Sequence, residues 1–487
     1  MTRAIQPALF IDGEWRTTPN STVVINPATG AELAHIAIAG SAETTDAINA
    51  ASSALQQWRK TSGFERSEIL QRTAILMSER AEQIGHTLSL ESGKLLREAI
   101  GEVRFSADYF AWFAGEARRL EEVSSVSGRR GGPQMVVRKP VGVVASLTPW
   151  NFPISIQARK VAPALAAGCT IVARPSEQAP LAVMAFFQCL IDASIPAGVI
   201  NVLNGPAGPI TETLLDDDRV RAISFTGSTP VGQKLYARAS TSMKRLALEL
   251  GGCAPFIVCD DADLSLAVEQ AMIAKFRNCG QSCIAANCFY VAENVYESFV
   301  AGLSDRIGSL HLGDPLHEET TLGPLINAHR RQELEQLHEQ TLRAGFQIIT
   351  QAPALPPTTD LSPDCYLPPA LFATPLLDDI EPTFLEQEIF GPLTLVVGFY
   401  DLNLLMQQLT AQPLGLAGYV FSQDTTNALR VATQLEVGIT GVNDGLPSAA
   451  NVPMGGVKQS GLGREGGHQG IEEFLHTQYL ALRSAWY

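Results

Sequence analysis

The sequence predicts an α/β protein with two doubly wound parallel sheets. From Val141 to Leu250, short apolar runs alternate with segments long enough to be helices, and a second alternating region begins at Cys253. Continuous apolar runs of this kind are typical of parallel strands that helices cover on both faces. The chain length agrees, because 487 residues correspond to about two or three domains.

The part of the chain before these regions predicts helices and then extended structure. Apolar residues recur at three- and four-residue steps from Ile48 to Trp58 and again through 69–84, which gives each segment one apolar face. Residues 135–146 are rich in valine and predict extended backbone, with Pro140 at an edge or bend.

The two alternating regions predict strands and helices in order. In the first region the expected strands are 141–147, 170–173, 199–203 and 222–225, and the expected helices are 155–166, 181–192 and 231–239. In the second they are strand 256–258, helix 264–277 and strands 393–399 and 418–421. The proline-rich segment 352–369 predicts a surface loop. Parallel sheets bind ligands at the carboxyl ends of their strands, so candidate residues are sought there.

Composition excludes several classes of protein. With 46% hydrophobic and 17% charged residues, the chain has a globular composition and not that of a disordered or coiled-coil protein. The net charge of −15 argues against nucleic-acid binding. The longest uncharged run, 140–158, has Pro149, Asn151 and Pro153 in its middle, which argues against a transmembrane helix.

The cysteines and histidines predict neither a disulfide framework nor a metal site. The chain has eight cysteines and opens without a secretory signal pattern, so we expect reduced thiols and a cytoplasmic protein. Cys279 and Cys283 are four residues apart, but no second Cys/His pair follows at zinc-finger spacing.

A glycine-containing turn follows one of the expected strands. Gly227 and Ser228 lie between strand 222–225 and helix 231–239, where backbone N–H groups at a helix N-terminus can bind a pyrophosphate. The spacing is G-x-x-x-x-G and not the dinucleotide fingerprint, so this turn taken alone favours an ordinary strand–turn–helix junction.

Three further side chains have the chemistry of an active site. Asn151 lies between two prolines after a buried strand, Glu249 ends an apolar strand before two glycines, and Cys283 lies in a glycine-containing polar loop. They could serve as an amide donor, a general base and a nucleophile. The alternatives are a stiff turn, a solvated acid and a small buried hydrophobe, and Cys279 competes with Cys283 on composition alone.

Together these motifs resemble the NAD(P)-dependent aldehyde dehydrogenase superfamily. In order, they are P-W-N-F-P at 149–153, F-T-G-S at 225–228, L-E-L-G-G at 248–252, G-Q-S-C at 280–283 and Q-E-I-F-G-P at 387–392. The resemblance runs from 26–30 to 463–465. Segments 275–278 and 456–466 are most similar to the succinate-semialdehyde dehydrogenase group of that family.

The resemblance implies a catalytic role for each candidate. It selects Cys283 as the nucleophile that forms a thiohemiacetal, with the Asn151 amide and the Cys283 N–H holding the oxyanion. Glu249 would activate the water that hydrolyses the thioester, because relatives that transfer the acyl group to coenzyme A lack this glutamate. Lys160 and Glu465 match positions near a proton path.

The resemblance also implies a nicotinamide dinucleotide cofactor. Its contacts would be Trp150, Gly227, Ser228, Leu250, Glu388 and Phe390. At the adenosine ribose the signals conflict: Arg174 would attract a 2′-phosphate, whereas Glu177 matches an acid that accepts the 2′-OH of NAD and would repel that phosphate. We expect NAD, with NADP as the alternative.

For the substrate, the resemblance implies a carboxylated aldehyde. Arg159, Arg277 and Ser448 match the carboxylate-binding residues, which favours oxidation of succinate semialdehyde to succinate. Ordinary surface arginines and an incidental serine are the alternative. Other substrates would be glutarate semialdehyde or neutral aliphatic or aromatic aldehydes. A third hypothesis is a non-catalytic structural protein.

Some positions depart from the family pattern. Met454 stands where Phe is common, and 447–451 is unusual for the substrate loop. Cys279 stands where small residues are usual, so a reversible disulfide with Cys283 and an inert thiol are both open.

The resemblance divides the chain into three parts. Residues 1–121 and 141–251 would form the dinucleotide-binding domain, and 252–459 the catalytic domain. Residues 122–140 and 460–487 would form a small β module that builds homodimers or homotetramers. The active site would lie in a tunnel between the first two parts.

Overall fold

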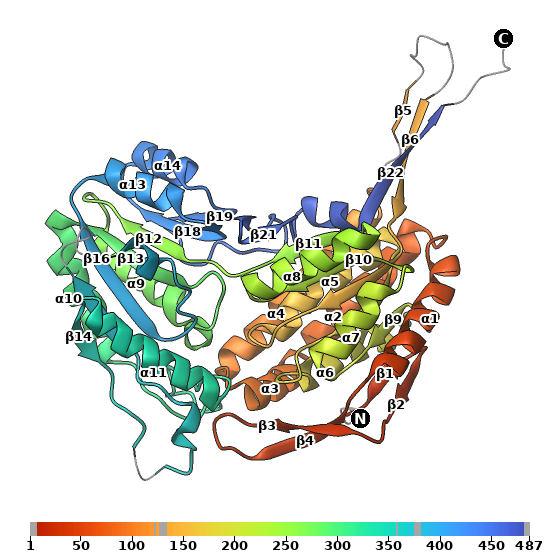
Figure 1. Ribbon diagram of the computed structural model, residues 1–487, viewed down its shortest axis with the longest axis horizontal. Helices are drawn as coiled ribbons and strands as arrows, with labels where there is room; N and C mark the ends of the chain where they lie inside the picture. The colour runs from red at the N-terminus through yellow and green to blue at the C-terminus, as the bar shows by residue number, and fades with distance from the viewer. Residues whose placement is uncertain (1–6, 121–122, 126–133, 357–358, 375–380, 482–487) are drawn as a thin grey trace.

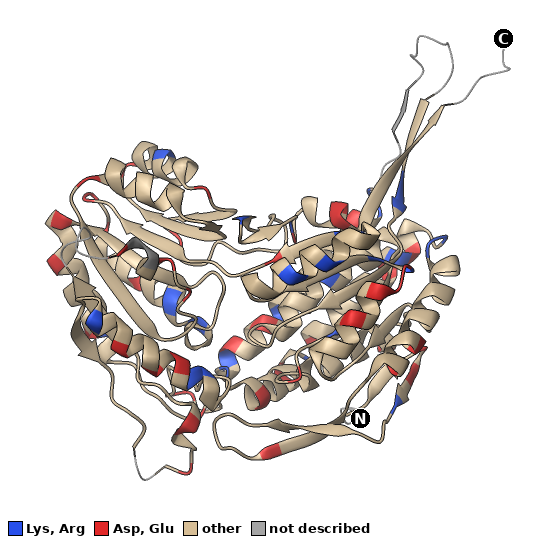
Figure 2. Cartoon of the chain, viewed as in Figure 1, with Lys and Arg blue, Asp and Glu red and all other residues tan. Residues whose placement is uncertain are grey.

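The computed structural model describes residues 7–120, 123–125, 134–356, 359–374 and 381–481. The chain forms two lobes, each built around one large sheet, and a narrow arm that projects from the first lobe (Figure 1). The sheets have eight and seven strands, so the predicted fold class is confirmed. Acidic and basic residues are interspersed over the helices of both lobes (Figure 2).

The chain begins with two antiparallel strand pairs and four helices. The strands are β1 (Leu9–Ile11), β2 (Glu14–Arg16), β3 (Ser21–Ile25) and β4 (Glu32–Ala37). The helices are α1 (Ser41–Trp58), α2 (Gly63–Glu79), α3 (Ala81–Ser92) and α4 (Leu96–Ala117). Helix α2 begins after Ser62, whose hydroxyl accepts from Glu65 N–H while the Glu65 carboxylate accepts from Ser62 N–H. Such a capping box fixes where the helix starts.

The first sheet is parallel at its centre. Its strand order is β2-β1-β9-β8-β7-β10-β11-β21. The strands after the first pair are β7 (Val143–Leu147), β8 (Thr170–Arg174), β9 (Ile200–Val202), β10 (Val220–Thr226), β11 (Arg245–Glu249) and β21 (Gly461–Leu462). The helices between them are α5 (Pro153–Ala167), α6 (Leu181–Asp192), α7 (Ala207–Asp216) and α8 (Thr229–Ala239).

Both faces of this sheet are covered. Val143 and Ala145 of β7 pack into the core on the side of α1, whereas Val144 packs on the side of α2 to α6. Successive strand residues point to opposite faces, so a strand buried on both sides must be apolar throughout. This is the physical reason that the apolar runs predicted these strands.

The second sheet has the order β14-β15-β16-β13-β12-β18-β19 and is parallel except at β14. Its strands are β12 (Ala254–Val258), β13 (Ala286–Ala292), β14 (Gln347–Gln351), β15 (Ala370–Thr374), β16 (Leu393–Phe399), β18 (Ala417–Phe421) and β19 (Ile439–Val442). The helices are α9 (Leu264–Phe276), α10 (Glu293–Gly308), α11 (Ala328–Arg343), α12 (Pro382–Leu385), α13 (Leu402–Ala411) and α14 (Thr425–Gln434). Strands β17 (Leu414–Gly415) and β20 (Val457–Lys458) form a separate pair.

The arm is an antiparallel sheet of β5 (Val123–Ser125), β6 (Gln134–Pro140) and β22 (Leu475–Ala481). Strand β22 pairs with β6 from Leu475 opposite Pro140 to Ala481 opposite Gln134. Figure 1 shows the arm extending beyond the first lobe.

Three expectations about local structure need correction. Residues 69–84 belong to two helices, because the helical path changes at Arg80. Residues 135–146 form two strands of different sheets, separated at Gly142, whose φ of +134° turns the chain. The segment 352–369 is not wholly a surface loop, because Cys365 and Leu367 are buried. No helix within the described residues is long and apolar enough to span a membrane.

Candidate active site

Two cavities meet at Cys283. One, of about 400 Å³, is lined by residues that follow strands of the first sheet and by the start of α11. The other, of about 280 Å³, is lined by α4, α5 and the chain around Arg277. We call them the nucleotide-side cavity and the aldehyde-side cavity. Cys283 lines both, so a group bound in one can reach a group bound in the other at this thiol.

The nucleotide-side cavity lies where parallel strands end together. Leu147 of β7 is level with Phe225 of β10, and Thr226 is level with Glu249 of β11. The residues that follow these strands therefore emerge at one edge of the sheet, as expected for a ligand site. Of the predicted cofactor residues, six line this cavity: Trp150, Gly227, Ser228, Leu250, Glu388 and Phe390.

The backbone before Cys283 is left-handed over three consecutive residues. Asn278, Cys279 and Gly280 have φ values of +54°, +55° and +73°. A Cβ at Gly280 would lie 2.3 Å from the carbonyl oxygen of Gly391, so only glycine fits there. This short segment connects the end of α9 to Cys283, which lines both cavities. Cys283 is partly exposed, whereas Cys279 is buried.

Burial raises the pKa of the Cys283 thiol to about 12, and the charges of Arg159 and Arg277 oppose that rise. A thiol with this pKa is protonated at neutral pH. A thiolate must form before it can attack a carbonyl carbon, so a group that takes this proton is needed.

The Asn151 side chain is held against the Cys283 loop. Its Nδ2 donates to the Gln281 carbonyl at 3.2 Å. An amide NH₂ has two hydrogens, so one N–H stays available for another acceptor. Asn151 is buried and lines the nucleotide-side cavity together with Cys283. An amide donor in this place can stabilise an oxyanion formed at the carbon that Cys283 attacks.

Glu249 ends β11 in a buried site, not a solvated one, with only 5% of its surface exposed. Burial and the nearby charge of Glu465 raise its pKa well above the usual 4.5, while Lys160 and Arg159 lower it. Lys160 pairs with Glu465 and donates to Ser224 Oγ at 3.2 Å. The three predicted residues are thus all buried and their charges act on one another, although none of them lines either cavity.

The nucleotide-side cavity fits a dinucleotide. Among the described residues, the buried Gln178 Oε1, Thr226 Oγ1 and Glu388 Oε1 in its lining have no hydrogen-bond partner in the chain. Buried polar atoms are rarely left unpaired, so they indicate a ligand with hydroxyl or amide donors. The N-terminus of α8 at Ser228 lies in the same lining, with backbone N–H groups suited to a pyrophosphate.

Arg174 and Glu177, predicted to lie at the adenosine ribose, are outside the lining of this cavity. They contact each other: Arg174 Nη2 pairs with the Glu177 carboxylate and also donates to the Gly205 carbonyl at 2.8 Å, and its Nε donates to the same carbonyl at 3.1 Å. The guanidinium is therefore held by groups of the protein itself.

The aldehyde-side cavity is lined by all three predicted carboxylate ligands, Arg159, Arg277 and Ser448. Arg159 is 9% exposed, and its Nε has no hydrogen-bond partner among the described residues. Its Nη1 lies 2.6 Å from Met454 Sδ. The Arg277 guanidinium lies 4.9 Å from the centre of the Phe152 ring. A buried cation with an unpaired donor, such as Arg159, is costly unless an anion joins it, and the partly buried Arg277 adds a second positive charge to the same cavity.

A sequence profile described as "Aldehyde dehydrogenase family" matches residues 15–480. The chain belongs to this family.

Relatives of the chain in the aldehyde dehydrogenase family have several names. "Succinate-semialdehyde dehydrogenase [NADP(+)] GabD" of Escherichia coli is 39% identical over 476 residues, 97% of each chain. "Glutarate-semialdehyde dehydrogenase" of Pseudomonas putida is 39% identical over 97% of each chain. "3-Sulfolactaldehyde dehydrogenase" of Pseudomonas putida is 40% identical, over 97% of this chain and 96% of the relative.

The fold agrees with solved structures. A structure described as an Escherichia coli NADP-dependent enzyme has a TM-score of 0.93 at 38% identity and covers 98% of both chains. A Brucella melitensis aldehyde dehydrogenase has a TM-score of 0.93 at 37% identity, over 98% of this chain and 97% of that one. The protein is thus an aldehyde dehydrogenase, an oxidoreductase that acts on small aldehydes with NAD or NADP.

Sequence reasoning missed several residues of the aldehyde dehydrogenase site. Except for Thr226, which lies within F-T-G-S, they lie outside the family motifs: Gln178, Thr226, Arg330 and Glu333 line the nucleotide-side cavity, and Glu98, Glu102 and Phe105 line the aldehyde-side cavity. One signal was available on α4, where Glu102 lies on the same helical face as the buried Ala99 and Val103. A carboxylate on an apolar helix face needs a partner and so indicates a buried polar site. Within the described residues, no cluster of three metal-ligating side chains occurs.

Proposed function

We propose that the protein oxidises a semialdehyde to a carboxylate, and that succinate semialdehyde is its substrate. The observation that carries this proposal is the pair of guanidiniums, buried Arg159 and partly buried Arg277, in the cavity that opens at Cys283. A carboxylate at the far end of a short aldehyde would accept charge-assisted hydrogen bonds from both. The names of the curated relatives support a substrate with an anionic end.

Cys283 is the nucleophile of this proposal. Its thiolate adds to the aldehyde carbon and forms a thiohemiacetal whose oxyanion accepts from Asn151 Nδ2 and from the Cys283 N–H. Bound NAD(P)+ supplies the hydride acceptor. The acyl group left on Cys283 is a thioester, and attack by water on its carbonyl carbon releases the carboxylate and the thiol.

Glu249 acts as the general base for that water. Burial raises its pKa well above 4.5, which makes the carboxylate a stronger base toward water than a solvated glutamate. The Lys160–Glu465 ion pair, whose charges act on Glu249, is proposed as part of a proton path from this base.

NAD is the cofactor that we propose, with NADP as the alternative. The Glu177 carboxylate would accept the ribose 2′-OH of NAD, and it occupies Arg174 in an ion pair. A 2′-phosphate would have to break that pair and would lie beside a carboxylate.

The arm is proposed to build a homodimer or homotetramer. Strand β22 lies at the edge of the three-stranded sheet, with Tyr479 57% exposed, and Val136 of the neighbouring β6 is also exposed. An edge strand has unpaired backbone groups, and with exposed apolar side chains it can pair with a strand of another chain. Light scattering of the purified protein tests this proposal, and a monomer at micromolar concentration would contradict it.

Steady-state kinetics test the substrate and the cofactor together. The rate of NADH or NADPH formation is measured with succinate semialdehyde, glutarate semialdehyde, 3-sulfolactaldehyde, propanal and benzaldehyde, each with NAD and with NADP. The proposal expects the highest kcat/KM for succinate semialdehyde with NAD. Higher values for propanal or benzaldehyde would contradict the anionic substrate, and no turnover of any aldehyde would favour a non-catalytic role.

A further inference from the structure

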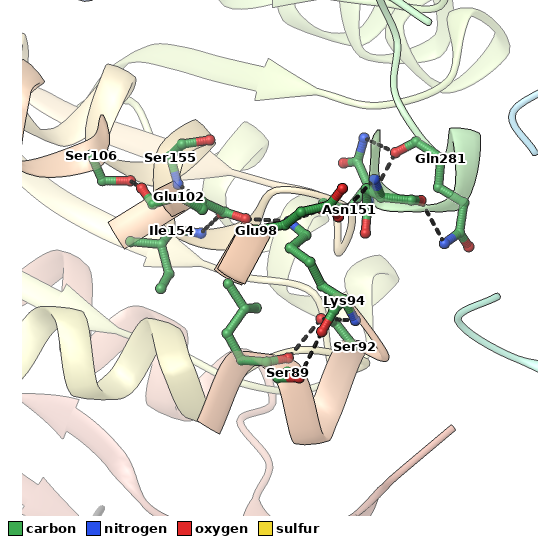
Figure 3. Close-up of polar contacts among 12 residues, drawn as sticks. Ser89, Ser92, Lys94, Glu98, Glu102, Ser106, Asn151, Ile154, Ser155 and Gln281 are labelled. Carbon is green, nitrogen blue, oxygen red and sulfur yellow. Dashed lines mark hydrogen bonds and ion pairs between the residues drawn. The ribbon is translucent and has the colours of Figure 1, made fainter. Parts of the chain in front are cut away.

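A buried polar network joins α3 and α4 to the loop that carries Asn151 (Figure 3). Glu102 on α4 accepts at Oε1 from the backbone N–H groups of Ile154 and Ser155, at 3.0 and 3.1 Å. These are the first donors of α5, which has no cap from its own N-cap residue, Phe152. A carboxylate from another helix therefore fixes where α5 begins.

Lys94 connects this cap to Asn151. Its Nζ pairs with Glu102 Oε2 and donates to the Asn151 carbonyl at 2.9 Å. The Lys94 carbonyl accepts from Ser89 Oγ at 2.6 Å, which anchors the backbone that carries this side chain. Figure 3 shows Lys94 lying between Glu102 and Asn151. Lys94 and Glu102 are 2% and 5% exposed.

The other side of Asn151 is held by the Cys283 loop. Asn278 Nδ2 donates to the Asn151 carbonyl at 2.9 Å and to the Gln281 carbonyl at 3.1 Å. The Asn151 backbone is thus fixed from two directions, and its side-chain amide is bound to the loop of the candidate nucleophile. A shift at either side would move the amide relative to Cys283.

A second buried glutamate also caps a helix but, within the part of the chain that the structure describes, has no lysine partner, so the two can be compared. Glu91 on α3 accepts from the backbone N–H groups of Leu181 and Ala182 at 2.7 and 2.8 Å, and so caps α6 as Glu102 caps α5. Among the described residues, no cation lies within ion-pair distance of Glu91. Capping a helix therefore does not need a lysine. The lysine at α5 has another partner, the Asn151 carbonyl.

We propose that Lys94 and Glu102 are positioning residues that hold the Asn151 amide where it can donate to the oxyanion. This inference rests on the proposed function, in which Asn151 is the oxyanion donor. A buried ion pair adds little stability on average, so its use here is to fix one conformation of the loop. Neither residue needs to touch the reacting atoms for this role.

A double-mutant cycle tests the proposal. The kcat of Lys94→Met is measured in the wild-type and in the Asn151→Ala background. Loss of an oxyanion donor costs about 100- to 1,000-fold in kcat, and a displaced donor costs part of that. We expect Lys94→Met to lower kcat about 10- to 100-fold in the wild type and less than about threefold in Asn151→Ala. Equal losses in both backgrounds would overturn the positioning role.

Matched controls separate positioning from folding. Lys244 is also buried and donates to two backbone carbonyls, of Asp217 and Val220, away from both cavities. Lys244→Met should leave kcat unchanged. Glu102→Gln keeps an oxygen acceptor for α5, and Glu91→Gln makes the same change at α6. Of these two variants, only Glu102→Gln is expected to lower kcat. Equal kcat values for Glu102→Gln and Glu91→Gln would overturn the proposal, even if Lys94→Met fails to fold.

The kcat of Asn151→Ala by itself shows which hypothesis is wrong, the oxyanion role of Asn151 or the positioning role of Lys94 and Glu102. A kcat within about threefold of the wild type would reject Asn151 as oxyanion donor, and with it the positioning role. A large loss for Asn151→Ala together with an undiminished effect of Lys94→Met would reject only the positioning role.

Discussion

The two cavities that meet at Cys283 are built differently. The nucleotide-side cavity is lined by short stretches of backbone that follow neighbouring parallel strands, such as Thr226–Ser228 and Leu250–Gly251. The aldehyde-side cavity is lined mainly by one face each of α4 and α5, with residues such as Glu98 and Arg159, and by the chain around Arg277 and Cys283. Much of one lining thus comes from strand ends and turns, and much of the other from side chains of two helices.

Because of this difference, cofactor binding and substrate recognition depend on different parts of the protein. A pyrophosphate and ribose can be bound by glycine turns and helix N-termini, which every member of a fold can share. An aldehyde's tail is recognised by charges that change with one substitution. Relatives about 40% identical accordingly bear the names of succinate, glutarate and sulfolactaldehyde enzymes. The predictions below test whether the two cavities act separately.

The largest effect is expected at the residue that both cavities share. Replacing Cys283 by Ala should lower kcat more than about 1,000-fold with every aldehyde, because no nucleophile is left. Binding of NAD, measured by quenching of tryptophan fluorescence, should stay within about threefold. If the variant still turned over at the wild-type rate, Cys283 would not be the nucleophile.

Arg277 should affect the aldehyde side alone. Arg277→Met keeps the volume and removes the charge, and we expect kcat/KM for succinate semialdehyde to fall about 100-fold, or about 2–3 kcal/mol. The kcat/KM for propanal should change little, and so should the KM for NAD. An equal loss with propanal would show that Arg277 supports the fold or the thiol and not the carboxylate.

The charges of both cavities act on the Cys283 thiol, and its alkylation by iodoacetamide reports them. With a pKa of about 12, the thiolate fraction rises with pH, so the rate constant should increase about tenfold per unit from pH 7 to 9.5. Succinate bound beside Arg159 and Arg277 should slow the reaction by neutralising the cations that favour the thiolate. A plateau below pH 9 would show that the thiol ionises far more easily than its burial implies.

The smallest effect is expected at Glu388, on the nucleotide side alone. Burial raises its pKa to about 7, against the Gly252 N–H and the charge of Arg330. As pH falls from 8 to 6 the carboxylate becomes protonated and loses its charge-assisted hydrogen bonds, so the Kd of NAD should rise about fivefold. Glu388→Gln should bind NAD with a Kd that does not change over this pH range. A wild-type Kd that is constant from pH 6 to 8 would contradict a carboxylate contact with the cofactor.

Much of the fold could be predicted from sequence because burial on both faces makes the parallel strands continuously apolar. Helix α6 and strand β16 have the predicted bounds. The break between α2 and α3 was missed, since both helices keep the same apolar spacing across Arg80 and no Gly or Pro marks the break. The separation of β6 from β7 depends on Gly142 and on pairing with β22, which is distant in the sequence.

The candidate site could be predicted where one short motif contains both the functional residue and the neighbours that fix its backbone conformation. Asn151 and Cys283 are of this kind, and the structure brings them to one cavity. Lys94 and Glu102 could not be assigned, because the backbone groups that they bind, the Asn151 carbonyl and the Ile154 N–H, lie 57 and 52 residues away in the sequence. The Arg174–Glu177 contact is also not evident from sequence, where the two side chains give competing signals for the cofactor, whereas in the structure they form an ion pair and neutralise each other.

The long-range partners of the last strands have a consequence for how the protein is made. Strand β21 closes the edge of the first sheet beside β11, and Glu465 supplies the partner of Lys160. Until the ribosome has added residues 461–465, β11 has no neighbouring strand on this edge and Lys160 has no carboxylate partner. The first lobe, although encoded first, therefore needs β21 and Glu465, which are encoded after the strands of the second sheet.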